Sequence, residues 1–200
     1  MKISDIKQQV KRQDRYSIYI DGKYSFSLSE NELMHRGLKI DQEFNKESFE
    51  EIKQTAVEDK AYMQAVELIA RRKRSQWEMQ QYLKRKGYSN NTTAKILNKL
   101  SINKLLDDKD FARAWVENRR LLKHTSKRKL WQELKQKRVA DSLITEVLDS
   151  DETDEQKVLA EIIEKKITQT RYKNKEKLMA YLVRQGFSYS DVKDVLADKY

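Results

Sequence analysis

The 200-residue chain has no cysteine, no proline and only four glycines. Without cysteine it can form no disulfide and use no thiol in catalysis, and this absence slightly favours a cytoplasmic location. Proline breaks helix interiors, and an average usage of about 5% would give about ten prolines, so its absence fits a mostly helical chain. No glycine lies within ten residues of another, which excludes a glycine-rich phosphate-binding loop.

Long apolar runs and metal-ligand clusters are also missing. No apolar run approaches the roughly 18 residues of a membrane span, so we expect no membrane partner. The start, MKISDIKQQV, lacks the apolar stretch of a signal peptide. The two histidines, His35 and His124, have no carboxylate cluster at metal-ligand spacing. Asp107, Asp108 and Asp110 could surround a magnesium ion, but their place before an apolar helix favours capping. We expect no cofactor, metal or catalytic residue.

The overall composition favours several small cores over one large core. Hydrophobic residues make up 38% of the chain, charged residues make up 37%, and the mean hydropathy is −0.93. Such a chain can bury a real core but keeps much surface, which fits an elongated string of modules better than one ball.

The first 54 residues show strand periodicity, unlike the rest. Apolar and polar side chains alternate over residues 16–20 and again over 24–28, which predicts a β-hairpin. Residues 3–10 are a candidate further strand. Residues 29–36 have the pattern of a short capped helix that ends at Gly37.

The apolar pattern also bears on the length of the hairpin loop. A two-residue turn at residues 21–22 would place Ile20 opposite Lys23 and mismatch the apolar faces. We therefore expect a three-residue loop, residues 21–23. That loop gives the pairs Ile20–Tyr24 and Ile18–Phe26.

One phrase occurs twice in the rest of the chain, as YLKRKGYS at residues 82–89 and as YLVRQGFS at 181–188. A glycine just past a helix end can take the left-handed conformation and close a Schellman turn, with an apolar contact across it. Here the contacts would join Leu83 to Tyr88 and Leu182 to Phe187. N-cap residues stand eight positions before each leucine, at Ser75 and Asn174, and Glu78 completes a capping box in the first copy.

A third copy lies between these two. Leu134 has Ser126 eight residues before it and Val139 five after it, but Arg138 stands at the glycine position. This turn must therefore be strained or differently made. Apolar residues occur four before and 13 and 14 after each leucine, in one helical stripe. They are Met79, Leu130 and Leu178, then Ile96–Leu97, Val147–Leu148 and Val195–Leu196.

The repeat predicts the fold class. A longer amphipathic segment precedes each copy, beginning near Tyr62, Phe111 and Val158. We predict a mainly α chain of three tandem three-helix modules after a small N-terminal β-hairpin element. The expected boundaries are 1–54 for the N-terminal extension and 55–104, 105–150 and 151–200 for the modules. Whether the repetition serves a function or only the architecture stays open.

The net charge of +10 is concentrated in the first two modules. Residues 71–138 carry 21 Lys or Arg against six Asp or Glu. Any one basic cluster is open to the plainer explanation of a solvated helix face, but a solvated face normally mixes signs. A stripe of five clusters indicates a polyanion partner. The candidate binding residues are Arg71, Arg72, Lys73, Arg74, Lys84, Arg85, Lys86, Arg119, Arg120, Lys123, Lys127, Arg128, Lys129, Lys135, Lys137 and Arg138.

Four aromatic residues lie among these clusters and could stack on bases. Trp115 and Tyr82 fall on the apolar faces traced above, so we expect them in the core. Trp77 and Trp131 are the others, and Trp77 is the least committed to a core position.

Three phrases taken together resemble the RecX family of recombination regulators, which bind filaments of the RecA recombinase. They are RSQWEMQQYLKRKGYS at 74–89, LLDDKDFARAWVENR at 105–119 and KLMAYLVRQGFS at 177–188. The resemblance covers about three quarters of the chain, from near Lys60 onward, and the hairpin looks like the extension of longer members. The middle phrase is the most specific. Arg138 departs from the usual glycine.

The resemblance implies three tandem modules in an elongated curved array, no enzymatic activity and a regulatory role in DNA repair and recombination. It implies binding in the groove of the RecA filament on single-stranded DNA. It also implies inhibition of strand exchange, ATP hydrolysis and the co-protease activity of the SOS response. We expect a cytoplasmic monomer, with duplex DNA as a further candidate partner.

Two alternatives remain open. A three-helix module with a tight second turn is close to a helix-turn-helix, which would make the chain an independent duplex-DNA-binding protein and usually a dimer. The chain could also be a helical-repeat scaffold for protein partners alone. The uneven charge argues against the scaffold, and the lack of an obvious dimerisation segment argues weakly against a repressor.

Overall fold

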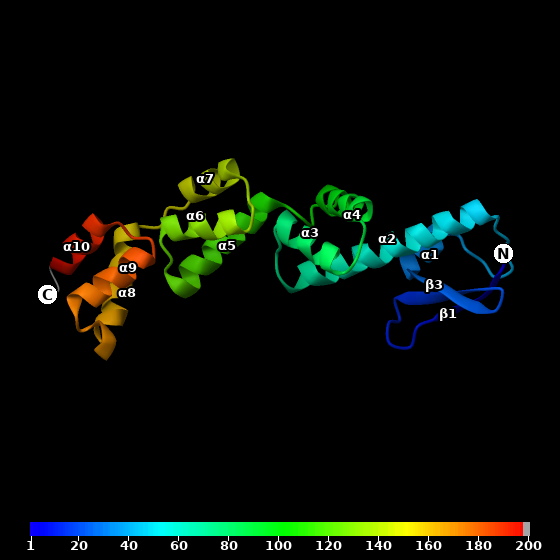
Figure 1. Cartoon of the computed structure of the whole chain (residues 1–200), viewed down its shortest axis with the longest axis horizontal. Helices are drawn as coiled ribbons and strands as arrows, with labels where there is room; N and C mark the ends of the chain where they lie inside the picture. Colours follow the sequence, from blue (N-terminus) through cyan, green and yellow to red (C-terminus); the bar gives the residue numbers. More distant parts are fainter. Residues whose placement is uncertain (198–200) are drawn as a thin grey trace. The chain divides into compact units, whose positions relative to one another are not determined.

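The computed structural model describes residues 1–197, which form two compact units. Unit 1 comprises Met1–Arg72 and Met79–Leu105, and unit 2 comprises Lys73–Glu78 and the chain from Leu106 onward. The division falls inside one helix, α3 (Gln76–Arg85). Figure 1 shows the order of the elements. The predicted class, mainly helical with a small N-terminal β element, is confirmed.

Unit 1 begins with a three-stranded antiparallel sheet in the order β1-β2-β3. The strands are β1 (Ile3–Gln8), β2 (Arg15–Ile20) and β3 (Lys23–Ser29), so the candidate further strand is confirmed as β1. Alternate residues of the strands are buried against one helix, α2 (Lys46–Arg71). The buried residues of this core are Ile3, Ile18, Ile20, Phe26, Leu28, Leu38, Ile52 and Ala56.

The hairpin loop is two residues long, so the predicted three-residue loop is wrong. Asp21 and Gly22 both have positive φ, 48° and 81°, as a two-residue turn with the twist of the strands requires. Ile20 pairs with Lys23. A bulge then shifts the register so that Ile18 faces Phe26, as predicted. The bulge realigns the apolar faces of the two strands, so the hairpin does not need a longer loop to match them.

Helix α1 (Glu30–Arg36) has the predicted cap and end. The Ser29 side chain accepts a hydrogen bond from the Glu32 N–H, and Gly37 ends the helix in the left-handed conformation. Asp59 of α2 ties this cap to the sheet, because it accepts bonds from the Ser29 N–H (2.8 Å) and hydroxyl (2.6 Å) and pairs with Arg15 at 3.0 Å. The expected boundary at 54/55 lies inside α2, which runs unbroken across it.

The remaining helices form three sets of three, in the order that the repeat predicted. The first module is α2, α3 and α4 (Asn90–Ile102). The second module is α5 (Asp108–Lys123), α6 (Lys127–Gln136) and α7 (Asp141–Asp149). The third is α8 (Glu155–Ile167), a short 3-10 turn (Thr170–Tyr172), α9 (Lys175–Arg184) and α10 (Tyr189–Ala197). The predicted stripe residues Met79, Leu130 and Leu178 are fully buried.

The middle helix of every module, α3, α6 or α9, ends in the same turn. The Tyr88 N–H donates to the Leu83 carbonyl at 3.3 Å, and the matching bonds are Val139 to Leu134 at 3.2 Å and Phe187 to Leu182 at 3.3 Å. These are the predicted Schellman turns. Arg138 has φ 58°, so the middle turn is strained by a side chain in the left-handed region, but it is not differently made.

The middle helices also begin as predicted. The side chains of Ser75, Ser126 and Asn174 each accept a hydrogen bond from the N–H three residues on. The capping box at Glu78 stays a prediction; the bond that its carboxylate accepts here comes from Lys137, at 2.7 Å. Asp107 caps α5 and accepts from the N–H groups of Lys109 and Asp110, which confirms its capping role.

One hydrogen bond recurs between successive middle helices within unit 2, and we call each such contact a joint. The Ser75 hydroxyl donates to the Lys137 carbonyl at 3.0 Å, and the Ser126 hydroxyl donates to the Gln185 carbonyl at 2.6 Å. Each acceptor is the residue before a left-handed position, and both serines are fully buried. The capping serine of one module is therefore bound to the closing turn of the next.

A second hydrogen bond repeats at each joint. The Gln76 N–H donates to the Asp108 carboxylate at 2.7 Å, and the Lys127 N–H donates to the Glu155 carboxylate at 2.9 Å. Each carboxylate belongs to the first residue of the next module's first helix. The negative charge therefore lies at the start of two helices at once, which favours both helix dipoles.

Candidate nucleic-acid and filament interface

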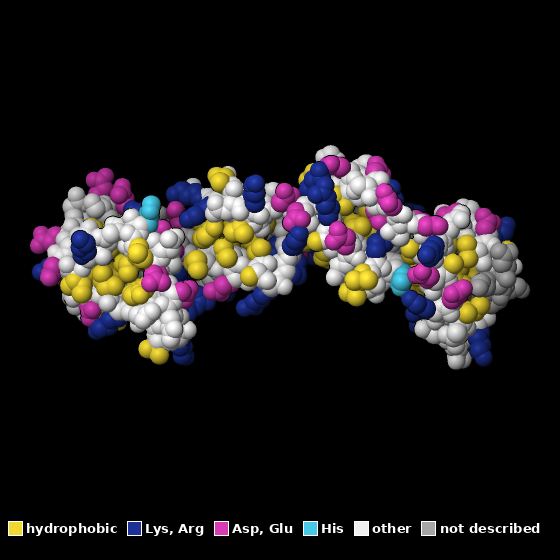
Figure 2. Space-filling model, turned by 180° about the vertical axis from the view of Figure 1, so that it is seen from behind, with side chains coloured by type: hydrophobic (Ala, Val, Ile, Leu, Met, Phe, Trp, Pro, Cys, Tyr) yellow, Lys and Arg dark blue, Asp and Glu magenta, His cyan; other side chains and the backbone are white. Residues whose placement is uncertain are grey.

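The structure divides the predicted basic residues into cations paired with an acid of the same chain and cations without such a partner. Figure 2 shows Lys and Arg side chains standing next to Asp and Glu side chains on the face that it presents. Pairing matters because a cation already neutralised by a carboxylate gains less from a phosphate or an acidic partner.

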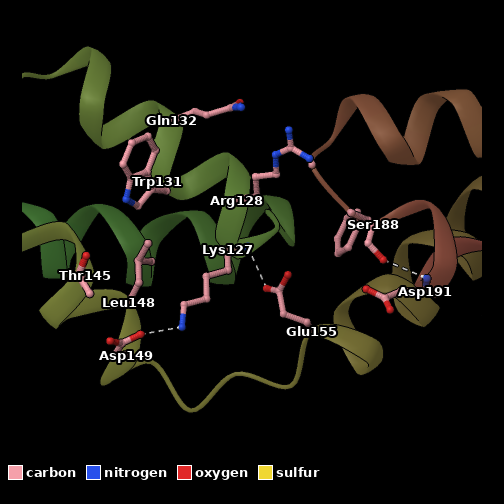
Figure 3. Close-up of a pocket in the computed structure, with 12 residues that line it drawn as sticks. Lys127, Arg128, Trp131, Gln132, Thr145, Leu148, Asp149, Glu155, Ser188 and Asp191 are labelled. Carbon is pink, nitrogen blue, oxygen red and sulfur yellow. Dashed lines mark hydrogen bonds and ion pairs between the residues drawn. The ribbon is translucent and has the colours of Figure 1, made fainter. Parts of the chain in front are cut away.

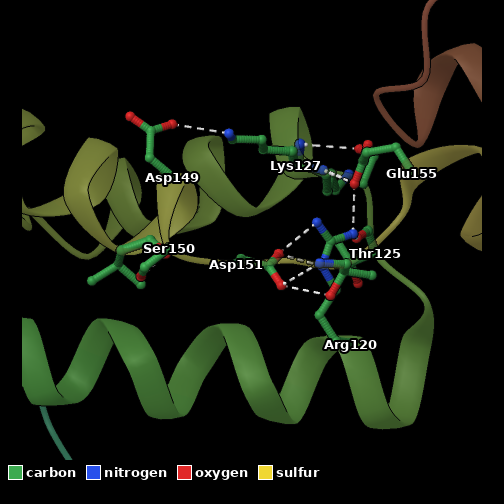
Figure 4. Close-up of polar contacts among 11 residues, drawn as sticks. Arg120, Thr125, Lys127, Asp149, Ser150, Asp151 and Glu155 are labelled. Carbon is green, nitrogen blue, oxygen red and sulfur yellow. Dashed lines mark hydrogen bonds and ion pairs between the residues drawn. The ribbon is translucent and has the colours of Figure 1, made fainter.

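Among the paired cations, Arg120 is bound to two carboxylates and a backbone carbonyl of the same chain (Figure 4). Its side chain is only 10% exposed and lies 2.8 Å from Asp151 and 2.6 Å from Glu155, and it also donates to the Thr125 carbonyl. Burial alone would raise the pKa of Asp151, but the hydrogen bonds from Thr153 and Arg120 outweigh it and lower that pKa. Arg120 therefore fixes the segment between α7 and α8 onto α5.

Arg119 also has an internal partner. Its guanidinium lies 2.7 Å from the Glu133 carboxylate and 4.5 Å from the centre of the Trp115 ring. The Trp115 N–H donates to the same carboxylate at 2.8 Å. Trp115 packs against the buried core of the second module, as expected, and Tyr82 is half-buried.

Four lysines of the predicted set form ion pairs, three of them at the surface and one, Lys137 with Glu78, partly buried. Lys73 pairs with Asp110 at 2.6 Å, Lys127 with Asp149 at 3.0 Å, Lys135 with Asp141 and Lys137 with Glu78 at 2.7 Å. Burial raises the pKa of Asp108, while the hydrogen bond from the Gln76 N–H lowers it in part.

Six of the predicted cations have no acidic partner among residues 1–197, so their charge is available to a ligand. Lys84, Arg85, Lys86, Lys123, Arg128 and Arg138 are exposed and have no ion pair with any residue from 1 to 197. Lys86 lies over the Tyr82 ring at 5.7 Å. Arg72 and Arg74 make contacts of their own and do not belong to this group; Arg71 and Arg72 are exposed at the end of α2, and Arg74 and Lys129 are half-buried. The cations around 84–86 and 128 are therefore the strongest candidates for contact with a polyanion.

Two tryptophans stand on exposed faces of the middle helices. Trp77 of α3 is 37% exposed and Trp131 of α6 is 38% exposed. At helical spacing, Lys84 shares the face of Trp77, and Arg128 and Lys135 share the face of Trp131. The face of Trp131 combines an aromatic ring with two cations within one helical turn, which is the combination that binds single-stranded nucleic acid, whereas the nearest cation on the face of Trp77 is two turns away.

Trp131 also lines a groove of about 760 Å³ in unit 2, which the sequence reasoning missed (Figure 3). Its walls come from α6, α7, the first residue of α8, the turn that joins α9 to α10 and the first turn of α10. A signal for Trp131 was present, because it follows the stripe residue Leu130 directly and so points away from the core stripe. The opposite wall, at residues 186–191, could not be assigned without the fold.

Membrane-spanning and metal-binding features are missing from the part of the chain that the structure describes. Within residues 1–197, no helix is long and apolar enough to cross a bilayer. The same residues contain no group of three His, Asp or Glu side chains placed to hold a metal ion.

Four family models match the chain in order. Residues 1–45 match the regulatory protein RecX N-terminal domain, and residues 61–100 match the RecX first three-helix domain. Residues 107–148 match the second three-helix domain, and residues 152–196 match the third. The matches therefore extend to the hairpin as well as to all three helical modules.

Curated relatives and solved structures agree with these models. The regulatory protein RecX of Clostridium tetani is 31% identical, over 98% of this chain and 93% of the relative. That of Bacillus subtilis is 30% identical, over 94% of this chain and 73% of the relative. A crystal structure of regulatory protein RecX aligns with a TM-score of 0.73 at 25% identity, over 98% of both chains. RecX from Lactobacillus salivarius, at 20% identity over 70% of this chain and 95% of that one, aligns with a TM-score of 0.60 and bears on the fold alone.

Proposed function

Because this chain belongs to the RecX family of regulatory proteins, we propose that it binds the RecA filament on single-stranded DNA and inhibits it. Family membership implies regulation of RecA in general. The finer proposal is that the chain binds in the filament groove. There it lowers strand exchange, ATP hydrolysis and co-protease activity without catalysing a reaction itself.

The observation that carries the finer proposal is the set of cations without an internal partner. Residues 71–138 contain an excess of 15 positive charges, and Lys84, Arg85, Lys86 and Arg128 are exposed and form no ion pair with any residue from 1 to 197. DNA phosphates are the densest source of complementary charge, and counterion release on binding drives such association. A scaffold for neutral protein partners would gain nothing from this excess.

The test is RecA-dependent ATP hydrolysis on single-stranded DNA while this protein is titrated in. DNA is kept in excess, so that competition for free strand does not lower hydrolysis. We expect hydrolysis to fall at amounts well below one molecule per RecA, because one bound molecule would affect several neighbouring subunits. Hydrolysis that stays constant up to equimolar protein would contradict the proposal and favour a duplex-DNA-binding protein or a scaffold.

A direct binding measurement separates the remaining alternatives. Fluorescently labelled single-stranded DNA, duplex DNA and RecA filaments are each titrated with the protein at one salt concentration. The proposal expects the filament to bind most tightly. Tightest binding to a particular duplex sequence would instead support the helix-turn-helix alternative.

A further inference from the structure

The groove next to Trp131 has the size and the chemistry of a ligand site. Its volume of about 760 Å³ lies within the usual range for small-molecule sites. The apolar part of the lining is formed by Trp131, Leu148 and Phe187, and the hydrogen-bonding side chains around it are Gln132, Thr145 and Ser188. A mixed lining of this kind suits a flat ligand with an apolar face and a polar edge.

Trp131 is placed as a stacking surface. Its ring is 38% exposed, whereas Trp115 of the same module is packed against the core and hydrogen-bonded to Glu133. The Lys135 ammonium lies 5.4 Å from the centre of the Trp131 ring. Leaving part of an indole ring in water forgoes hydrophobic stabilisation, which a stacked base would recover.

The charges around the groove favour a base inside and a phosphate at the rim (Figure 3). Asp149 is paired with Lys127, and Glu155 is paired with Arg120, so neither carboxylate attracts a further cation strongly. Arg128 stands three residues before Trp131 on the same helix face and has no ion pair among residues 1–197. A phosphate at Arg128 would leave its own base within reach of the Trp131 ring.

The same charges disfavour other occupants. A free phosphate or an acidic peptide inside the groove would meet the carboxylate of Asp191, which has no ion pair among residues 1–197. A nucleobase is uncharged, and its N–H groups can donate to Asp191 or to the Gln132 amide oxygen. The groove therefore matches a nucleotide in a strand better than it matches an anion alone.

We propose that this groove is a subsite for one nucleobase of single-stranded DNA, stacked on Trp131 with its phosphate on Arg128. The inference rests on the proposed function in one respect, that single-stranded DNA is a ligand. It goes further in assigning the base to one groove and one ring.

Tryptophan fluorescence tests the subsite in the absence of RecA. A short oligo(dT) strand is titrated into the wild-type protein, Trp131→Phe and Trp77→Phe. Stacking on thymine quenches indole emission, so we expect quenching in the wild type and in Trp77→Phe and loss of most of it in Trp131→Phe. Trp77 is the matched control because its exposure, 37%, is close to the 38% of Trp131, and it does not line this groove.

Affinity measurements supply a second readout. Trp131→Ala should bind oligo(dT) about ten-fold more weakly, and Trp131→Phe, which keeps an aromatic ring, should recover most of the loss. A strand of the same length without bases should bind the wild type and Trp131→Ala equally. Circular dichroism melting shows whether each variant is folded.

Three outcomes would overturn the subsite. They are equal quenching in Trp131→Phe and the wild type, unchanged affinity in Trp131→Ala, and a Trp131 signal that responds to DNA-free RecA but not to oligo(dT). The last would make the groove a protein-docking site. If the protein inhibits RecA but oligo(dT) does not quench Trp131 fluorescence, only the subsite is contradicted. If oligo(dT) quenches Trp131 fluorescence but the protein does not inhibit RecA, only the proposed regulation is contradicted.

Discussion

Single residues show how differently charge is used along this chain. Arg120 and Lys127 are both basic, lie in neighbouring segments and were both candidate binding residues. The Arg120 side chain is 10% exposed and holds two carboxylates, whereas the Lys127 side chain is 46% exposed and its partner Asp149 is 65% exposed. A buried pair fixes structure, because removal of one partner leaves the other as an uncompensated charge.

Replacing Arg120 by alanine should therefore destabilise unit 2 strongly. We expect a loss of about 3 kcal/mol in the free energy of unfolding, because Asp151 and Glu155 lose their cation. Urea unfolding followed by circular dichroism measures the loss. Lys127→Ala is the control, and it should cost less than about 1 kcal/mol as an exposed pair. Equal losses in the two variants would contradict the structural role of Arg120.

Asp151 makes the same network sensitive to pH. Its pKa is lowered in the folded protein, so its contribution to stability is present above the ordinary aspartate value and is lost as pH falls through the folded value. Asp151→Asn should therefore be less stable than the wild type at neutral pH, and the gap should narrow below about pH 4. Urea unfolding at a series of pH values measures it. A gap that stays constant through the acid range would show that Asp151 acts by shape alone.

At the scale of elements, the three closing turns share one backbone geometry but differ in their surroundings. Gly87 and Gly186 have similar φ, 84° and 95°. A Cβ on Gly87 would meet nothing within 4 Å, whereas a Cβ on Gly186 would lie 2.5 Å from the Ser126 hydroxyl. The third turn therefore needs glycine for the joint as well as for its backbone conformation.

Alanine at the two glycines separates these requirements. Gly87→Ala should cost about 1 kcal/mol of unfolding free energy from backbone strain alone. Gly186→Ala should cost distinctly more, because the new Cβ pushes Ser126 off the Gln185 carbonyl. In a Ser126→Ala background the excess should shrink, and a double-mutant cycle from urea unfolding measures the coupling. If the losses of unfolding free energy in Gly186→Ala and Ser126→Ala simply add in the double variant, the two residues are not coupled through the hydrogen bond of the joint.

The elements also show which parts of the fold local sequence can predict. The Schellman turns were predictable at Gly87 and Gly186 because capping chemistry lies within one helix turn. The length of the hairpin loop was not predictable, because a bulge between Ile18 and Tyr19 shifts the register, and alternation of apolar residues does not report a bulge. The joint at Ser75 links residues that are 62 positions apart in the sequence, and the joint at Ser126 links residues that are 59 positions apart. No local sequence pattern reports such contacts.

The candidate interface was predictable only in part, for the same reason. Sequence shows that residues 71–138 are rich in cations, but it does not show which cation has an acid beside it. Arg120 finds its partners 31 and 35 residues later, and Lys137 finds Glu78 59 residues earlier. Ion pairing depends on tertiary structure. Charge density in the sequence therefore indicates a basic region, and the fold shows which of its cations are paired.

For the whole molecule, charge distinguishes the modules more than structure does. Residues 55–104 carry eleven basic and four acidic side chains, whereas residues 151–200 carry ten of each. The modules share helix order, caps and turns, so a common fold carries two different surfaces. We infer that phosphate contacts come mainly from the first two modules and that the third serves other contacts.

Charge reversal tests this division of labour. The triple variant Lys84→Glu, Arg85→Glu and Lys86→Glu should bind RecA filaments at least about ten-fold more weakly at moderate salt, because it removes three exposed cations that have no ion pair among residues 1–197. The dependence of log affinity on log salt should become shallower, by about 0.7 for each phosphate contact removed. Fluorescence anisotropy with labelled single-stranded DNA in the filament measures both quantities.

The matched control has the same change in net charge but lies in the third module. Lys157, Lys173 and Lys177 are exposed and stand where acids balance bases, so their reversal to glutamate should change filament affinity much less. Equal weakening by both triples would mean that only net charge matters, through long-range attraction that salt screens. Unchanged binding in both would remove the basic surface from the mechanism and leave uncharged contacts with RecA to carry the affinity.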